Sequence, residues 1–313
     1  MLVKILSQKS FLFQFFLGSA FLALLFLNIK PVEPTLYGIS GIVLLLLTAL
    51  IFHLFYTYSN LISQPTFGLW FYMIWLLVFS KISTDLPMTA SLFITTIMFW
   101  RWISTTNTDE NKRILFDSGF LLATSTLLYP PSIFLILFLL ISYMYTHTIG
   151  LKSILLLLIG MLLPVLIGIQ LFYLTGHAEY LSDFGAFLRP NVWESPATAL
   201  IPLGILLLLC WLNHLRNFSM QNIYKRHKYF LTFVYFVNWL LILIFYGGDN
   251  PLSLMFLGLP VSIFMSIFVQ HTESNRKKEF WLWIYAVLMA VYFFSNELLS
   301  LYNSILGDVS FEF

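Results

Sequence analysis

Apolar runs long enough to cross a lipid bilayer recur along the whole chain, and they restrict its fold more than any other feature. A spanning helix needs about 20 mostly apolar residues, within a range of about 17 to 25. Only 10% of the residues are charged, whereas a typical soluble domain has about 25%. The sequence therefore predicts an all-α polytopic transmembrane helix bundle, with residues 1–313 as one integral membrane domain. The candidate spans, several of them short, are 11–29, 37–58, 67–82, 88–103, 118–129, 132–147, 153–175, 200–213, 229–246, 252–269 and 280–299.

The segment 118–147 decides how many times the chain crosses, because Pro130 and Pro131 interrupt it. Two consecutive prolines remove two N–H donors and clash with the preceding turn, so a helix tends to end there. The segment is either one long kinked span or two short ones. A re-entrant hairpin would leave the following loops on the same side as two spans would.

The distribution of Lys and Arg separates these readings, since both residues are enriched in cytoplasmic loops. If 118–147 crosses twice, thirteen of the sixteen Lys and Arg residues lie inside, and only Lys30, Lys81 and Arg189 lie outside. A single crossing would place ten of the sixteen outside. The pattern therefore predicts about eleven crossings, in a range of ten to twelve, with the N-terminus inside and the C-terminus outside.

The longest loop on the outer side covers 176–199, and we expect an interfacial helix within it. Its apolar residues recur at a spacing of three to four, which is typical of an amphipathic helix lying on a membrane surface. These residues are Tyr180, Leu181, Phe184, Phe187 and Leu188. The loop is either a connector lying on the interface or part of a site.

Candidate site residues lie on the outer side, where several acids have few cations near them. A carboxylate beside an apolar surface can have a raised pKa and act as a general base. We expect Glu33, Asp183 and Asp249 to be the catalytic candidates, although Asp249 in Gly-Gly-Asp-Asn-Pro also fits a turn-forming role. The substrate-binding candidates are His177, Glu179 and Arg189.

Other residues favour structural roles. Asp85 is spaced to pair with Lys81 along a helix, and the inner acids, Asp117 among them, have basic neighbours that can neutralise them. The single cysteine, Cys210, lies in an apolar run and fits a small packing residue. We expect no metal site and no cofactor, and the net charge of +2 suggests no nucleic-acid partner. No pair of broken segments indicates an internal repeat; only Pro130-Pro131 is conspicuously broken.

Three segments carry a resemblance to a family: the start Met1–Ser10, the stretch from Asn111 through Pro131, and 251–264. They resemble an uncharacterised family of bacterial inner-membrane proteins of about this length, known as a domain of unknown function. The resemblance covers the whole chain and implies multi-pass insertion in the bacterial inner membrane. It implies no activity.

A second, local resemblance concerns a polar inner loop followed by Gly, a short apolar helix, a Pro turn and a long apolar helix. This order is similar to a stretch of GT-C type glycosyltransferases, which use polyprenyl-phosphate sugars at the outer face. Their essential acid lies in the first outer loop, where this chain has Glu33. The chain departs from that family because this loop is short, and because the paired-acid motif and the large C-terminal outer domain are absent.

No motif is specific enough to name a reaction, so the sequence leaves open whether the protein is an enzyme. The first hypothesis is a membrane component of cell-envelope biogenesis, with the lipid bilayer and a membrane protein as partners. The alternative is a GT-C-like enzyme or handler of polyprenyl-linked glycan acting on the outer face. A secondary transporter is a weaker alternative, because no charged residue falls at the middle of a predicted span.

Overall fold

The computed structural model describes residues 3, 6, 36–59, 65–80, 84–104, 111–146, 151–176, 179–180, 201–218, 223–247 and 250–294. Every regular element in these residues is helical, so the predicted all-α class is confirmed there. The elements are α3 (Leu36–Ser59), α4 (Pro65–Val78), α5 (Leu86–Ser104), α6 (Asn111–Leu128), η2 (Pro130–Leu135), α7 (Ile136–Thr146), α8 (Leu151–Leu174), α10 (Ile201–Phe218), α11 (Ile223–Tyr246), η4 (Pro251–Leu257), α12 (Gly258–His271) and α13 (Asn275–Phe293). Here η marks a 3₁₀ helix.

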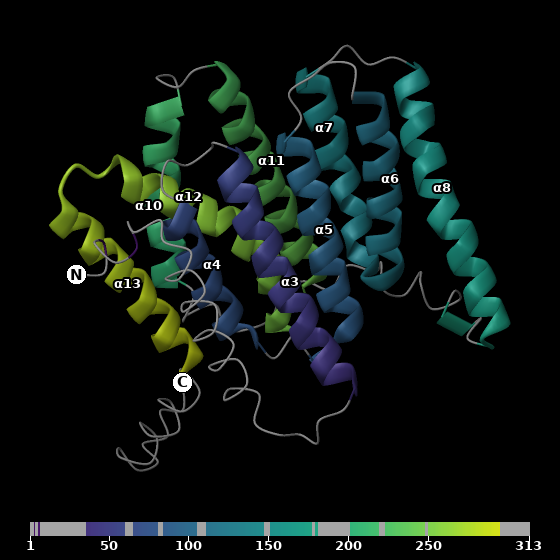
Figure 1. Ribbon diagram of the computed structural model, residues 1–313, viewed down its shortest axis with the longest axis horizontal. Coiled ribbons are helices and arrows are strands. Elements are labelled where there is room, and N and C mark those ends of the chain that lie inside the picture. Colours follow the sequence, from purple (N-terminus) through teal and green to yellow (C-terminus); the bar gives the residue numbers. More distant parts are fainter. Residues whose placement is uncertain are drawn as a thin grey trace, which may run out of the picture.

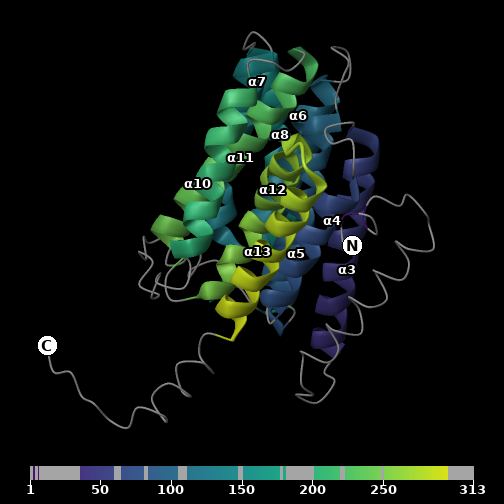
Figure 2. The same cartoon turned by 90° about the vertical axis from the view of Figure 1, so that its left-hand side faces the viewer.

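The helices lie side by side and run alternately in opposite directions (Figure 1), with α8 at one edge of the bundle and α13 at the other. Viewed from the side (Figure 2), α3 and α10 lie on opposite flanks, and α4 and α12 lie between them. From residue 37 onward, each predicted apolar run coincides with one described helix, or with a 3₁₀ helix and the α-helix that continues it. The first run, 11–29, lies outside the described residues.

The segment 118–147 folds as two antiparallel pieces rather than as one kinked helix. Helix α6 ends at Leu128, and Pro130 and Pro131 begin η2, which α7 continues in the opposite direction. Proline is tolerated in the first turn of a helix, where its missing N–H would have no partner within the helix. The double proline therefore ends one helix and starts the next.

A second 3₁₀ helix, η4, begins at Pro251, in the gap that the sequence analysis left between the predicted runs 229–246 and 252–269. Asn250 caps η4, because its side-chain oxygen accepts a hydrogen bond from Leu252 N at 3.0 Å. The 3₁₀ helix then continues directly into α12. Sequence reading took 252–269 as one continuous apolar run, since a Pro at its start does not interrupt the hydrophobic pattern.

Three helices in the described part of the chain are long and apolar enough to cross a membrane: Lys152–Leu174, Lys225–Tyr246 and Leu252–His271. Shorter apolar helices cover Gly38–Leu54, Thr66–Val78 and Pro130–Tyr145. Their environments differ, because Leu252–His271 is almost entirely buried whereas Lys152–Leu174 is mostly exposed.

Helix α12 forms the centre of the bundle and contacts α4, α10, α11 and α13. It is apolar on all sides, as a helix without a solvent face must be. Its start is fitted to α4: the Trp75 indole N–H donates to the carbonyl of Leu254 at 3.2 Å. A Cβ at Gly258 would collide with the same indole ring, so the close contact requires glycine there. Cys210 is buried with its Sγ 3.2 Å from Met265 Sδ, which fits the packing role.

Glycines also allow α6 and α8 to approach each other at backbone distance. A Cβ at Gly119 would collide with the carbonyl of Leu157, and a Cβ at Gly160 would collide with the carbonyl of Phe116. Small residues at such contacts are a common means of associating helices where no water is present to drive burial. The contacts at Gly119 and Gly160 lie on one face of α8, and the rest of this helix is mostly exposed.

Replacing Gly160 with Ala should destabilise the protein by about 1–3 kcal/mol, because the added methyl group overlaps backbone atoms that cannot rotate away. The melting temperature of the purified protein in detergent measures the effect. Gly204→Ala is the matched control, since this helical glycine of α10 has no atom within 4 Å of its Cβ position. That change should leave stability equal or raise it by up to about 1 kcal/mol. Equal melting of the Gly160→Ala variant and the wild type would contradict the close contact.

Candidate functional site

Most of the site residues predicted from the sequence lie outside the described residues. These are Glu33, His177, Asp183, Arg189 and Asp249. Glu179 is described and is exposed beyond the end of α8. The proposed interfacial helix in 176–199 also lies outside them, apart from Gly176, Glu179 and Tyr180. Whether the predicted catalytic and binding residues come together therefore stays a prediction.

The start of the segment 176–199 is attached to the end of α6. Gly176 lies two residues after the end of α8, and its φ of +75° places it in the left-handed region that favours glycine just beyond helix ends. Beyond it, the Tyr180 hydroxyl donates to the carbonyl of Leu127 at 3.2 Å, and its ring stacks on Phe172 with centroids 4.9 Å apart. Partial burial and the nearby Asp85 carboxylate raise the pKa of Tyr180.

Asp85 caps α5. Its Oδ1 accepts a hydrogen bond from Met88 N at 3.1 Å, and its carbonyl accepts one from the Thr89 hydroxyl at 2.8 Å. A carboxylate in this position satisfies an N–H that has no partner within the helix and interacts favourably with the helix dipole. The expected structural role of Asp85 is supported, but through helix capping; Lys81, the partner we expected, lies outside the described residues.

A buried chain of hydroxyl groups joins α5, α6 and η2 near this capped end. Ser91 Oγ lies 2.7 Å from Ser125 Oγ, which donates to Ser132 Oγ at 3.0 Å. Ser132 in turn lies 3.4 Å from Thr126 Oγ1. Hydrogen bonds of this kind connect helices in apolar surroundings and contribute about 0.6–2 kcal/mol each. The chain of hydroxyls fixes the position of the double-proline turn.

The two 3₁₀ segments contact each other through aromatic rings. Tyr129, just before η2, stacks on Phe256 of η4 with centroids 5.1 Å apart. In the reciprocal pair, Phe134 of η2 stacks on Tyr246 at the end of α11 with centroids 4.7 Å apart. Trp239 covers the other side of this region by stacking on Phe256 at 4.1 Å. The two turns therefore lie at the same end of the bundle and are joined through Tyr129 and through α11.

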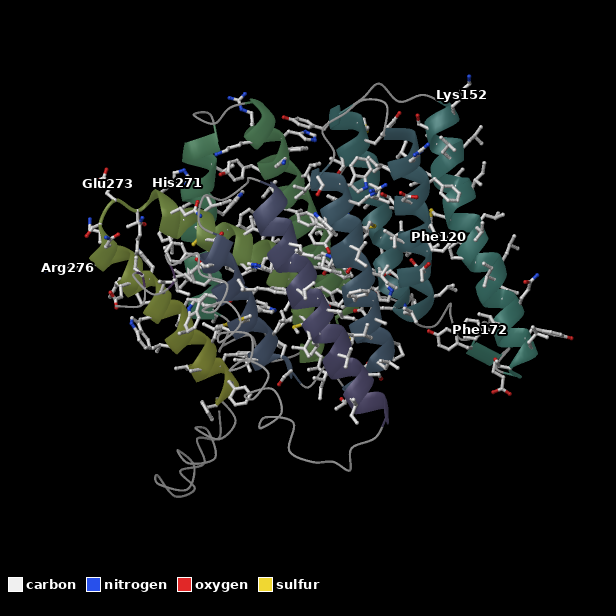
Figure 3. The ribbon with its side chains drawn as sticks, in the orientation of Figure 1. Phe120, Lys152, Phe172, His271, Glu273 and Arg276 are labelled. Atoms are coloured by element: carbon white, nitrogen blue, oxygen red, sulfur yellow. The ribbon has the colours of Figure 1, made fainter. Side chains whose placement is uncertain are left out.

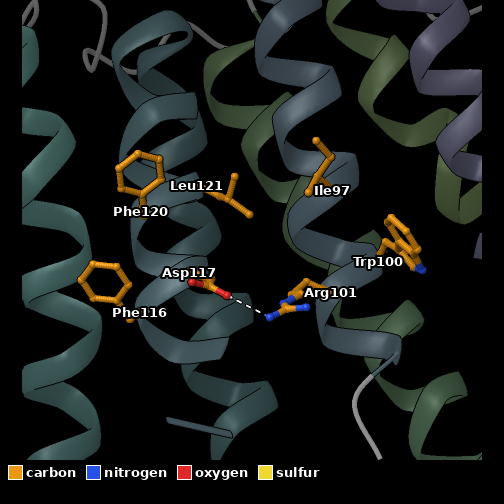
Figure 4. A pocket seen from close by; sticks show the side chains of 7 residues that line it. All are labelled: Ile97, Trp100, Arg101, Phe116, Asp117, Phe120 and Leu121. Atoms are coloured by element: carbon orange, nitrogen blue, oxygen red, sulfur yellow. Dashed lines mark hydrogen bonds and ion pairs between the residues drawn. The ribbon is translucent and has the colours of Figure 1, made fainter. Parts of the chain in front are cut away.

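The opposite end of the bundle carries an open groove between α5 and α6, of about 520 Å³. Figure 4 shows its lining: an ion pair between Arg101 and Asp117, and apolar or aromatic side chains around it. Arg101 Nη2 lies 3.1 Å from Asp117 Oδ2, and the two side chains are 54% and 40% exposed, so the pair is accessible from outside. The remaining lining residues are Ile97, Trp100, Phe116, Phe120 and Leu121.

A second groove of about 400 Å³ adjoins the first. It lies between α6 and α8 and is lined by Arg113, Phe116, Asp117 and Leu156. Phe116 and Asp117 line both grooves. We call the two together the inner groove.

Sequence reading missed the inner groove, although it expected Asp117 to be neutralised by a basic neighbour. The ion pair with Arg101 confirms that expectation. The available signal was the occurrence of opposite charges at the same ends of two successive apolar runs, Arg101 late in one and Asp117 early in the next. Pattern alone could not tell which faces of α5 and α6 these residues occupy.

The described residues include no group of three or more His, Cys, Asp or Glu side chains placed to hold a metal ion. The chemistry that their arrangement supports is recognition: cations at the mouth of the inner groove and apolar walls inside it.

Replacing Asp85 with Ala should cost about 0.5–2 kcal/mol, because the α5 cap is lost. Asp85→Asn keeps an oxygen that accepts the Met88 hydrogen bond, so its melting temperature should lie near that of the wild type. Both variants are compared by thermal melting in detergent. Equal loss in both variants would show that the charge of Asp85, and not its cap, stabilises the protein.

Comparison with known proteins gives one result. No curated protein and no solved structure gives a significant match. Residues 1–302 match the model of a family described as a family of unknown function, DUF6427. This agrees with the resemblance to an uncharacterised family, and the match covers nearly the whole described helical bundle. The chain belongs to the DUF6427 family of unknown function.

Proposed function

We propose that this protein is a multi-pass integral membrane protein of a bacterial inner membrane, with about eleven crossings. The single observation that carries the proposal is the exposed apolar surface of α8. This helix contacts the bundle along one face, and its remaining faces expose large apolar side chains such as Leu158, Leu162 and Leu166. A water-soluble protein rarely exposes a contiguous apolar surface of that size.

The placement of cations supports the predicted orientation. Described Lys and Arg residues lie at the end of α5 and at the starts of α6, α8, α11 and α13. Because successive helices alternate in direction, the end of α5 and the starts of α6, α8 and α11 face the same side (Figure 1), whereas α13 begins farther down in that view. In Figure 3, Lys152 marks that end of α8 and Phe172 the other. Enrichment of Lys and Arg on one side is typical of the cytoplasmic face.

Paired cysteines on α8 test this orientation. In a Cys210→Ala background, Thr175→Cys should react with a membrane-impermeant maleimide in intact spheroplasts. Lys152→Cys should react only after lysis, because it lies at the opposite end of the same helix. Both positions are exposed, so accessibility within the fold is matched. Labelling of Lys152→Cys in intact spheroplasts would reverse the orientation, and release of the protein by alkaline carbonate would contradict membrane insertion.

Within the membrane we propose a role as a membrane component of a cell-envelope assembly. The observation that supports this role is that aromatic side chains fill the space between the central helices. Phe99 contacts both Tyr235 and Phe138, with ring centroids 4.4 and 6.2 Å apart, and Trp239 lies edge-on to Tyr235 at 6.3 Å. A secondary transporter is expected to hold its substrate near the midplane between broken helices. Here large aromatic rings occupy the space between α5, α7 and α11, which favours a structural subunit over a transporter.

The second candidate is a GT-C-like enzyme or handler of polyprenyl-linked glycan at the outer face. One observation favours it: Tyr180 is bonded to the end of α6, and Tyr129 is stacked on η4. The described residues nearest to Asp183 and Asp249 therefore belong to one connected region of the same end of the bundle. This is the arrangement that a site built from both acids would need.

Complementation separates the two candidates. In a strain that lacks the protein, sensitivity of the envelope to detergent is scored after expression of Glu33→Gln, Asp183→Asn or Asp249→Asn at wild-type protein level. A subunit role predicts full rescue by all three variants, because none changes the packing of the described bundle. Loss of rescue by any of them at equal abundance would favour the enzyme, since removing a general acid or base costs about 10²–10⁴-fold in rate.

A further inference from the structure

We propose that the inner groove binds one anionic phospholipid of the cytoplasmic leaflet, with its headgroup over Arg101 and Arg113 and its two acyl chains on either side of Phe116. The inference rests on the membrane insertion proposed above and adds a ligand class and a site to it. It is carried by the charge at the mouth of the groove, by the order of polar and apolar residues along it, and by its division into two parts.

The mouth of the groove carries an excess of positive charge. Arg101 and Arg113 line it, and Asp117 is the one acid among the residues that line its two parts. Lys152 lies one helical turn before Leu156 on α8, on the same side of that helix, and adds a further exposed cation. A lipid phosphodiester would accept hydrogen bonds from the Arg101 guanidinium group while Asp117 remains paired with it. A guanidinium group can bind both because it presents five N–H donors in a planar fork. Anionic headgroups are attracted by about 1 kcal/mol for each nearby cation.

The polar and apolar residues are ordered along the helices as a phospholipid would require. On α5, Ile97 lies one turn farther from the charged end than Arg101. On α6, Phe120 and Leu121 lie one turn farther in than Asp117, as Figure 4 shows. The charged groups therefore lie at the headgroup level, and the walls below them are apolar. Trp100 lies beside Arg101, where an indole ring favours the interface.

The division of the groove matches a ligand with two chains. Arg113, Phe116, Asp117 and Phe120 share one face of α6, because their spacing is three and four residues. Phe116 and Asp117 line both the part against α5 and the part against α8. The volumes of about 520 and 400 Å³ each lie in the range of about 300–1,000 Å³ that is usual for small-molecule sites. The contact of Gly119 and Gly160 with the facing backbones holds α8 close to α6, so the second part keeps its shape.

An alternative role for the ion pair is to hold α5 against α6 without binding any ligand. The two roles predict different outcomes when the acid is neutralised. If the groove binds an anion, Asp117→Asn removes a competing negative charge and strengthens binding. If the pair only connects the helices, Asp117→Asn lowers stability and leaves lipid selectivity unchanged.

The test measures lipids that remain bound to the purified protein after release from nanodiscs that contain equal amounts of phosphatidylglycerol and phosphatidylcholine. Native mass spectrometry gives the ratio of the two bound lipids. We expect Arg113→Gln and Arg101→Gln each to lower the ratio about fivefold, and Asp117→Asn to raise it about fivefold. Arg276→Gln, which removes an exposed cation at the start of α13, is the matched control and should leave the ratio unchanged.

Two results would overturn the proposal. One is a ratio that Arg113→Gln and Asp117→Asn leave unchanged or move in the same direction. The other is an effect of Arg276→Gln as large as that of Arg113→Gln, because this would indicate a diffuse annulus of lipid. Melting temperatures confirm that the variants are folded; if Arg101→Gln unfolds, the opposite shifts of Arg113→Gln and Asp117→Asn still decide. Carbonate extraction of the same variants shows whether the chain is in the membrane, so failure of the lipid site is distinguished from failure of membrane insertion.

Discussion

Backbone hydrogen bonding within each helix is the constraint on which the rest of this structure depends. Where the surroundings are apolar, an N–H or C=O group without a partner costs several kcal/mol, so each segment must satisfy its own backbone. The described regular elements are accordingly all helical. Different residues satisfy or terminate the backbone at different helix ends. Asp85 caps α5, Asn250 caps η4, and Gly176, just beyond the end of α8, has a left-handed conformation.

Once each helix has satisfied its own backbone hydrogen bonds, the contacts between helices depend on side chains. Where a glycine has no side chain, two backbones can come close together. Glycines bring α6 and α8 to backbone contact, and Gly258 admits the Trp75 indole against α12. Buried hydroxyls of Ser91 and Ser125 connect α5 with α6. Large rings fill the remaining space at the centre. Side-chain shape and a few polar contacts therefore hold the described helices together.

The two ends of the bundle differ in chemistry as a result. At one end, the double-proline turn contacts η4 and the end of α11 through stacked aromatic rings. At the other end, α5, α6 and α8 line the inner groove, whose mouth carries Arg101, Arg113 and Asp117. The ends differ most in their cations: described Lys and Arg residues lie near the groove, whereas Tyr129, Pro130 and Pro251 lie at the turns.

The sequence by itself determined the helical class, the places of the apolar segments from residue 37 onward, and the break at Pro130-Pro131, because hydrophobic run length and proline stereochemistry are local properties. It also indicated that Asp117 would have a basic partner. Tertiary structure alone decided that Arg101 is that partner, and that α12 is buried while the more apolar α8 is exposed. A uniformly apolar helix has no amphipathic face to indicate its neighbours, so which faces meet depends on contacts between residues far apart in the chain, such as Trp75 with Leu254.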